Sequence, residues 1–384
     1  MTLRRTLFTV HMWIGLVLGL FLAVLGLSGS LIVYDEKLGA LLDPPPHATA
    51  AGDPLPLTMI ADAARQAASA KGYDGQMQIV MPDAPGDAIA VRVGQISVMG
   101  NMPGMEPRRR GGAGRREGGR GGLQVFVDPV SGEVLGTRNA VLPSFLTFAH
   151  QLHGNFLMGR DGRSLVVGWL GVAMCLLGLS GLVLWWPRKG QWKYAFFVRR
   201  TAKGLRFHRE LHAATGIWIF VVFIAVSFSG VVLAWPRTLG APEGPRAPVV
   251  VENTGAKPIG AQEAVNAANA AMPGAVLRSV SLPARPGQAI SVTYLSHGAV
   301  NATVLVDPYS GKVLVTRDPS ESFLAWMRPV HQGSLGPVWK FLVFLSGLVP
   351  SLFVITGIIM WTRKRRRRVP MTMMTDDVTE ADAA

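Results

Sequence analysis

Four stretches of the chain carry no formally charged side chain over more residues than a helix needs to cross a bilayer. They cover residues 6–34, 164–187, 213–236 and 341–362. About 20 residues of helix cross the roughly 30 Å hydrocarbon core, where irregular backbone facing lipid is not stable. A membrane α-helical fold with four spanning helices is therefore predicted. The first stretch follows Arg4 and Arg5 as a signal peptide would, but its apolar run is too long for one, so we expect it to be retained.

Lysine and arginine predict the orientation of these helices. The loop at 188–212 carries eight basic residues against one acid, Glu210, and the tail at 363–384 opens with six consecutive Lys or Arg residues. By the positive-inside rule, this basic loop and both termini are cytoplasmic, and the long segments 35–163 and 237–340 lie outside. Much of the net charge of +14 sits beside the helix ends, where it meets anionic lipid. We therefore expect a lipid membrane partner and no nucleic acid.

One stretch of the sequence occurs twice. The run Val-Asp-Pro-Val-Ser-Gly that begins at Val127 returns as Val-Asp-Pro-Tyr-Ser-Gly at Val306, and each copy is followed by Ser-Phe-Leu, a histidine and a long apolar segment. Upstream, Ser28-Gly29 and Ser229-Gly230 occupy equivalent places in the first and third apolar stretches. The chain is predicted to be a four-helix transmembrane bundle made of two parallel repeats.

Each long external segment has the pattern of a small α+β module. The first module has a predicted helix at 57–71 and strands at 76–81, 88–93 and 123–127; the second has a helix at 259–271 and strands at 277–282, 289–294 and 302–306. Both end in Asp-Pro-x-Ser-Gly, which suits a hairpin turn closed by a left-handed glycine. The first module also contains a Gly/Arg-rich insertion at 99–122, which we expect to be disordered because it cannot bury enough apolar surface.

Six of the eight histidines fall into two layers. His11, His208 and His212 stand at the cytoplasmic ends of the first and third helices, and His150, His153 and His331 stand on the external side. Zinc would need three or four ligands at tetrahedral spacing, and neither layer has acidic residues at matching positions.

A haem iron needs only two axial ligands on opposite faces of a flat ring, which facing helices supply. The repeat pairs His11 with His212 for one haem and His153 with His331 for the other. His208 lies four residues from His212 on the same helical face, so the two cannot bind one iron from opposite sides. His208 and His150 are therefore alternates. From the residues alone, the chain is predicted to be a transmembrane electron conduit with haem.

Over residues 3 to 365 this order of features resembles the PepSY-associated transmembrane (PepSY-TM) proteins. Within that family it looks most like the inner-membrane dihaem ferrisiderophore reductases of the ferrioxamine reductase type. The resemblance implies PepSY-like modules in the periplasm of a bacterial inner membrane. It also implies an oxidoreductase with two haem b groups that reduces the Fe(III) of a siderophore of the hydroxamate type and releases Fe(II). Because the sequence has no Rossmann or flavin motif, we expect the electron donor to be a membrane quinol or a cytoplasmic flavoprotein.

Two other functions fit parts of the sequence. A siderophore or iron permease could use parallel repeats, but four helices leave little room for a large chelate. No Asp, Glu, Lys or Arg lies within the predicted spans to mark a substrate path. A membrane-anchored PepSY protein that binds ligands or regulates a peptidase, without redox activity, would leave the histidine layers unexplained.

The predicted orientation can be tested with one introduced cysteine. The chain has a single cysteine, Cys175, inside the second apolar stretch, so Lys193→Cys adds one thiol in the basic loop. If this loop is cytoplasmic, an impermeant maleimide added to intact spheroplasts labels the variant no more than the parent, and labels it after lysis. Labelling in intact spheroplasts would reverse the orientation.

Overall fold

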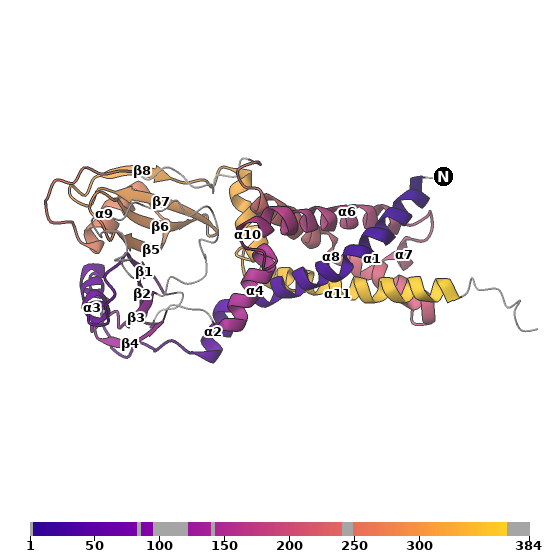
Figure 1. The fold of residues 1–384 in the computed structure, drawn as a ribbon, viewed down its shortest axis with the longest axis horizontal. Coiled ribbons are helices and arrows are strands. Elements are labelled where there is room, and N and C mark those ends of the chain that lie inside the picture. The colour runs from indigo at the N-terminus through magenta and orange to yellow at the C-terminus, as the bar shows by residue number, and fades with distance from the viewer. Residues whose placement is uncertain (1–2, 83–85, 95–121, 140–142, 240–248, 367–384) are drawn as a thin grey trace, which may run out of the picture.

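The computed structural model describes residues 3–82, 86–94, 122–139, 143–239 and 249–366. An elongated bundle of helices forms one end of the molecule and a β-sheet domain forms the other (Figure 1). Most of the Gly/Arg-rich insertion predicted at 99–122, and the tail beyond 366, lie outside the described residues.

Four helices are long and apolar enough to cross a membrane, as predicted. They are α1 (Leu3–Ile32), α6 (Gly168–Trp185), α8 (Gly204–Ala234) and α11 (Pro337–Arg366), and α6 continues a π-helical turn, η2 (Arg163–Val167). Helix α8 begins well before the predicted boundary at 213. Glu210 pairs with Arg206 one turn earlier, at 2.9 Å, so the charged residues extend the helix beyond its apolar part.

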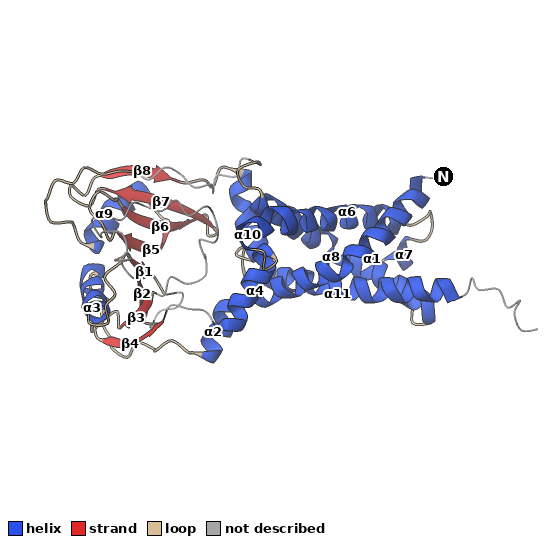
Figure 2. Ribbon diagram, viewed as in Figure 1, coloured by secondary structure: helices blue, strands red, loops and turns tan. Residues whose placement is uncertain are grey.

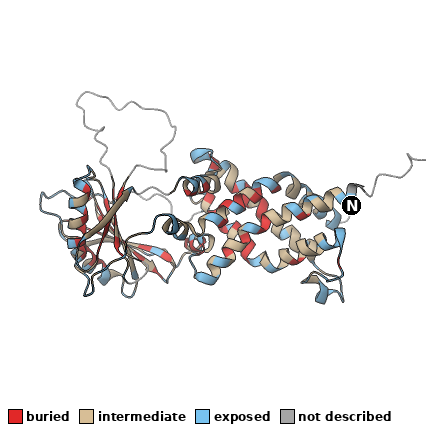
Figure 3. Cartoon of the chain, turned by 90° about the horizontal axis from the view of Figure 1, so that it is seen from below, coloured by how far each residue is buried: buried red, intermediate tan, exposed pale blue. Residues whose placement is uncertain are grey.

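The bundle has a regular order of neighbours. Helix α1 packs against α6 and α11, and α8 packs against the same two helices, so that α1 and α8 lie on one diagonal. Gly26 of α1 meets Gly347 of α11, where a Cβ on either residue would collide with the carbonyl oxygen of the other. Gly26 thus allows the two helices to pack closely. Most of the outward-facing residues are intermediate or exposed (Figure 3), as a surface covered by lipid requires.

Eight antiparallel strands form a single sheet in the order β4-β3-β2-β1-β5-β6-β7-β8 (Figure 2). The strands are β1 (Met77–Val80), β2 (Ile89–Val93), β3 (Leu123–Val127), β4 (Val134–Asn139), β5 (Val276–Leu282), β6 (Ile290–Ser296), β7 (Val300–Val306) and β8 (Val313–Arg317). Helices α3 (Leu57–Ser69) and α9 (Ala261–Ala271) pack on it. Strands β4 and β8, which follow the hairpin turns, were not among the strands predicted from the sequence.

The predicted hairpins are present. The Asp128 carboxylate accepts hydrogen bonds from the amides of Val130 (2.9 Å) and Ser131 (3.1 Å), and Gly132 has a φ of 74°. Asp307 repeats the arrangement with Gly311 at a φ of 70°. These amide donors hold the pKa of the Asp128 carboxyl well below its usual range.

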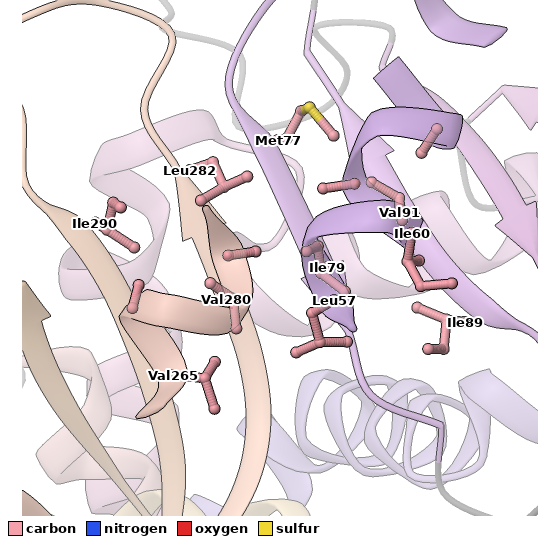
Figure 4. Close-up of a cluster of buried hydrophobic side chains, with 14 of the residues drawn as sticks. Leu57, Ile60, Met77, Ile79, Ile89, Val91, Val265, Val280, Leu282 and Ile290 are labelled. Atoms are coloured by element: carbon pink, nitrogen blue, oxygen red, sulfur yellow. The ribbon is translucent and has the colours of Figure 1, made fainter. Parts of the chain in front are cut away.

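The two predicted α+β modules share one sheet and one core. Strand β1 pairs with β5, placing Ile79 opposite Val280, and both side chains are fully buried. Figure 4 shows apolar side chains from both segments on either side of this pairing. The helices are also joined, since the Leu57 amide donates to the Gln262 side chain at 3.0 Å.

In the described part of the chain, six short helices connect the sheet to the bundle or lie at the bundle's other end. They are α2 (Asp35–Leu42), α4 (Ser144–Asn155), α5 (Gly159–Gly162), α7 (Trp192–Ala195), η3 (Phe323–Trp326) and α10 (Met327–Gln332). Helix α4 follows strand β4 and α10 follows β8, so both lead from the edges of the sheet to its junction with the bundle (Figure 1).

The shared sheet predicts that damage at the β1–β5 junction spreads to both long segments. Ile79→Ala removes a fully buried side chain and should destabilise the sheet domain by about 2–5 kcal/mol. Limited proteolysis with fragment mapping should then show faster cleavage in both 35–163 and 237–340. Met59→Ala, at a position 53% exposed on α3, is the matched control and should leave cleavage unchanged. Cleavage confined to 35–163 would contradict a jointly stabilised sheet.

Candidate functional site

Two histidines face each other at the end of the bundle remote from the sheet. His11 lies on α1 and His212 on α8, the two helices of one diagonal, and their ring centroids are 6.3 Å apart with ring planes at 73°. We call His11 and His212 the sheet-distal pair.

A second pair lies at the end of the bundle next to the sheet. His153 on α4 and His331 on α10 have ring centroids 5.8 Å apart and planes at 35°. We call them the sheet-proximal pair. With metal–nitrogen bonds of about 2 Å, two imidazoles on opposite sides of one ion have centroids roughly 6 Å apart. Both pairs have this spacing.

Hydroxyl groups orient the sheet-distal pair. The Nδ1 of His11 is 2.8 Å from the Ser180 hydroxyl, which donates its own proton to the Leu176 carbonyl at 2.6 Å. On the other diagonal helix, the Nδ1 of His212 is 2.8 Å from the Thr356 hydroxyl, which also donates to a backbone carbonyl. Because each hydroxyl proton is already used, the imidazole Nδ1–H donates and the lone pair is left on Nε2.

Backbone carbonyls orient the sheet-proximal pair. The Nδ1 of His153 donates to the Leu25 carbonyl at 2.9 Å, and the Nδ1 of His331 donates to the Val226 carbonyl at 2.8 Å. All four histidines therefore share one tautomer, in which Nε2 is available to a metal and Nδ1–H is held by a fixed acceptor. Burial lowers the pKa of His153 to about 4, and His331 adds to the effect, so this imidazole is neutral at pH 7.

Glycine gives the sheet-proximal histidines access to these carbonyls. A Cβ on Gly29 would lie 2.7 Å from Cε1 of His153, and one on Gly230 would lie 2.9 Å from Cε1 of His331. Gly29 comes four residues after Leu25 in α1, on the same helical face. The repeated Ser-Gly dipeptide of the sequence is thus the place where a histidine ring lies against a helix backbone.

Glycines on α1, α8 and α11 also leave space beside the sheet-distal pair. A Cβ on Gly15 or Gly216 would meet one side chain each, at 3.9 and 3.7 Å, and one on Gly357 would meet nothing within 4 Å. Gly15 and Gly216 lie four residues after His11 and His212, on the same faces as those histidines. The space that these glycines leave could accommodate a flat, bulky group between the two imidazoles.

The donor set fits haem iron. Among the described residues, no group of three or more His, Cys, Asp or Glu side chains is arranged to hold a metal ion, whereas the two histidine pairs each offer two axial ligands. These residues would hold one haem at each end of the bundle.

The alternates do not join either pair. The Nε2 of His150 bonds to the Asp35 carboxylate at 2.8 Å, so this nitrogen is already engaged. His208 lies on α8 one turn before His212, beside the Phe207 ring. Ser180 and Thr356, which orient the sheet-distal pair, were missed by the sequence analysis. Both are followed by glycine in equivalent helices, and this second Ser/Thr-Gly repeat could have identified them.

A model of the PepSY-associated TM region matches residues 8–364. The chain belongs to this family. It is therefore a multi-pass membrane protein with four apolar helices and an antiparallel sheet domain. No curated protein matches the chain. A crystal structure described as a lipoprotein from Clostridium difficile 630 matches with 8% identity over 69% of this PepSY-TM chain and 95% of its own, but its TM-score of 0.26 is too low to support an argument.

The contact between Gly29 and His153 predicts that a side chain at position 29 disturbs the sheet-proximal pair alone. In Gly29→Ala the new methyl group displaces the His153 ring from the Leu25 carbonyl. If each histidine pair holds one haem, the haem-to-protein ratio of purified protein should fall from two toward one. Gly39→Ala changes a glycine on α2 that has nothing within 4 Å, and should leave the ratio unchanged. An unaltered ratio in Gly29→Ala would exclude His153 as a ligand in this position.

Proposed function

We propose that this PepSY-TM protein is a dihaem reductase of the bacterial inner membrane that reduces a ferric hydroxamate-type siderophore in the periplasm and releases Fe(II). His11 and His212 would hold one haem b, and His153 and His331 the other. The observation that carries the proposal is the presence of two facing histidine pairs, one toward each end of a membrane bundle, all with Nδ1–H donated to a fixed acceptor.

The spacing of the pairs suits transfer across a membrane. Leu25, whose carbonyl holds His153, follows His11 by fourteen residues of α1, and Val226 follows His212 by the same number in α8. Fourteen residues of helix rise about 21 Å, which is shorter than the roughly 30 Å hydrocarbon core. Haem supplies one-electron redox chemistry when it is bound by two axial ligands.

The region between the two histidine pairs is apolar. Leu22 and Leu25 of α1, Leu170 and Met174 of α6, and Phe223 of α8 form a buried apolar cluster there. If both imidazoles of a pair bound one haem iron, that iron would have no open position for a substrate. Both features favour electron transfer over the binding of a substrate at the metal.

The symmetry of the fold supports the two-repeat architecture included in the proposal. From the β1–β5 junction outward, the strands follow their sequence order on both sides, β1 to β4 in one direction and β5 to β8 in the other. Helices α1 and α8 have equivalent neighbours, and so do α6 and α11. A parallel duplication accounts for both observations. With the basic loop inside, the sheet domain is periplasmic and the sheet-proximal pair is the one closest to an external chelate.

The chemistry of the chelate is consistent with this direction. Hydroxamate oxygens hold hard Fe(III) tightly, and one added electron gives Fe(II), which they hold less tightly. Each iron takes up one electron, and no atom needs to cross the membrane. The siderophore as substrate rests on the resemblance to ferrisiderophore reductases together with this chemistry.

The first test is the haem content of the protein. Protein purified from haem-replete cells should contain about two b-type haems per chain with low-spin bis-histidine spectra. A reduced-minus-oxidised spectrum with a pyridine haemochrome assay measures both. A colourless preparation would sink the proposal and would favour a membrane-anchored binding or regulatory protein.

The second test assigns a function to each pair. His331→Ala removes one sheet-proximal ligand, and after reduction with dithionite it should pass electrons to a ferric hydroxamate slowly in a stopped-flow experiment. His11→Ala should keep that step when a reductant reaches the sheet-proximal site, but lose reduction from the cytoplasmic donor. His297→Ala, at a surface loop residue, is the control. Wild-type spectra and rates in both ligand variants would transfer the assignment to His150 and His208.

A further inference from the structure

Two adjoining hollows lie at the sheet-distal end of the bundle, where α1, α6, α7 and α8 meet. The larger, of about 730 Å³, is within the size range of ligand pockets, and the smaller is about 380 Å³. They share Arg4, Trp186, Pro187 and Arg188. The smaller one is otherwise lined by aliphatic side chains such as Leu7 and Val183, so it presents an apolar path beside a more polar chamber.

Flat aromatic side chains line the larger hollow. Trp185, Trp186, Tyr194 and Phe197 all contribute to it. The Trp185 and Trp186 rings contact each other edge-on at 6.3 Å, and the Trp185 indole N–H donates to the Ala195 carbonyl at 2.9 Å. These contacts hold the aromatic side chains in place. Such walls suit a planar ring as the ligand.

The larger hollow lies within one helical turn of the sheet-distal histidines. A Cβ on Gly181 of α6 would lie 3.4 Å from Cε1 of His11. Trp185, which lines the hollow, comes four residues after Gly181 on the same face of α6. Four residues of helix rise about 6 Å. On the opposite side, Ala213 lines the hollow and directly follows His212. A molecule bound here would be next to the metal site at this end of the bundle.

Two arginines that line the hollow have no ion pair within the described part of the chain. Arg199 is paired with Glu210 at 2.6 Å, and Arg4 donates to the Leu184 carbonyl at 2.8 Å. Arg188 and Arg209 form no ion pair with any acidic side chain in the described part of the chain. Their charge favours a ligand that becomes negative when it loses a proton.

We infer that these hollows form a quinol-binding site, at which the proposed reductase receives its electrons. This inference rests on the proposed function and names its donor. The quinol ring would occupy the aromatic chamber, and its isoprenoid tail would follow the apolar hollow between Leu7 and Val183. An anionic phospholipid would satisfy the arginines but has no flat ring to match four aromatic walls. A soluble flavin would leave the apolar hollow unused.

The reaction at this site balances with the proposed reduction outside. Oxidation of one quinol to quinone breaks two O–H bonds and releases two protons and two electrons. The electrons reduce two Fe(III) ions, one each, at the far side of the membrane. Glu210 is held by both Arg199 and Arg206, so it is not the proton acceptor, and both protons leave to the water at the mouth of the hollow. Arg188 and Arg209 assist by favouring the deprotonated quinol.

The test compares variants of the full-length protein in nanodiscs. The probe is a decyl-substituted benzoquinone, whose binding is followed by quenching of tryptophan fluorescence, and its quinol form is the reductant in stopped-flow experiments. Arg209→Gln and Tyr194→Leu should each weaken quinone binding and slow haem reduction by quinol by about tenfold. Arg200→Gln alters an exposed arginine of the same loop that does not line the hollow, and should behave as wild type. Dithionite should reduce all four proteins equally.

The outcomes separate this inference from the proposed function. Equal quinone binding and quinol reduction in all four proteins would overturn the quinol site, even if dithionite-reduced protein still reduces a ferric hydroxamate. Failure of dithionite-reduced wild type to reduce the chelate would overturn the function while leaving the binding result intact. Nanodiscs made with and without phosphatidylglycerol provide the last comparison. If quinone binds wild type no better than Arg209→Gln, while phosphatidylglycerol stabilises only wild type, the site is a lipid site.

Discussion

The hydrogen bond from each histidine Nδ1–H is the constraint on which the rest of the bundle depends. A ring N–H that is packed between helices is costly without a hydrogen-bond partner, so the protein must supply an acceptor at a fixed place. The carbonyls of a helix already accept hydrogen bonds from amides of the same helix and are shielded by its side chains. A histidine ring from another helix can reach such a carbonyl only beside a residue that has no side chain. Gly29 and Gly230 provide that gap, while Ser180 and Thr356 provide hydroxyls instead. Small residues thus determine where the imidazoles lie and which nitrogen remains available.

The sheet domain takes part in the same arrangement. His153 and His331 are carried by α4 and α10, which follow the edge strands β4 and β8 of one eight-stranded sheet. Because β1 and β5 join the two halves at the centre, both edges belong to one sheet with a continuous core. The sheet-proximal pair is therefore supported from two directions, by the spanning helices that hold Nδ1 and by the sheet from which its own helices extend.

Much of this architecture follows from local sequence. Four long stretches without charged side chains predict the four spanning helices. Asp128 and Asp307 predict the two hairpin turns, because each carboxylate accepts hydrogen bonds from backbone amides only two and three residues later. His11 faces His212 and His153 faces His331, which are the pairings that the sequence repeat predicts. Two features could not be read in this way. The alternation of apolar and polar residues in β1 indicates a strand but does not identify the strand that pairs with it. The β1–β5 pairing therefore could not be predicted from the sequence. The first turns of α8 contain charged residues and include the ion pair of Glu210 with Arg206. The end of the uncharged stretch indicates where the membrane-spanning part begins, and it does not indicate where the helix begins.

The difference between the two kinds of Nδ1 acceptor has an evolutionary consequence. The acceptors of the sheet-proximal pair are main-chain oxygens of Leu25 and Val226, which every substitution at those positions retains. The acceptors of the sheet-distal pair are side chains, so a single codon change at Ser180 or Thr356 strengthens, weakens or removes them. Since such partners set how strongly an imidazole donates to a metal, homologous proteins can diverge in the electronic properties of one site while the other is inherited unchanged with the fold.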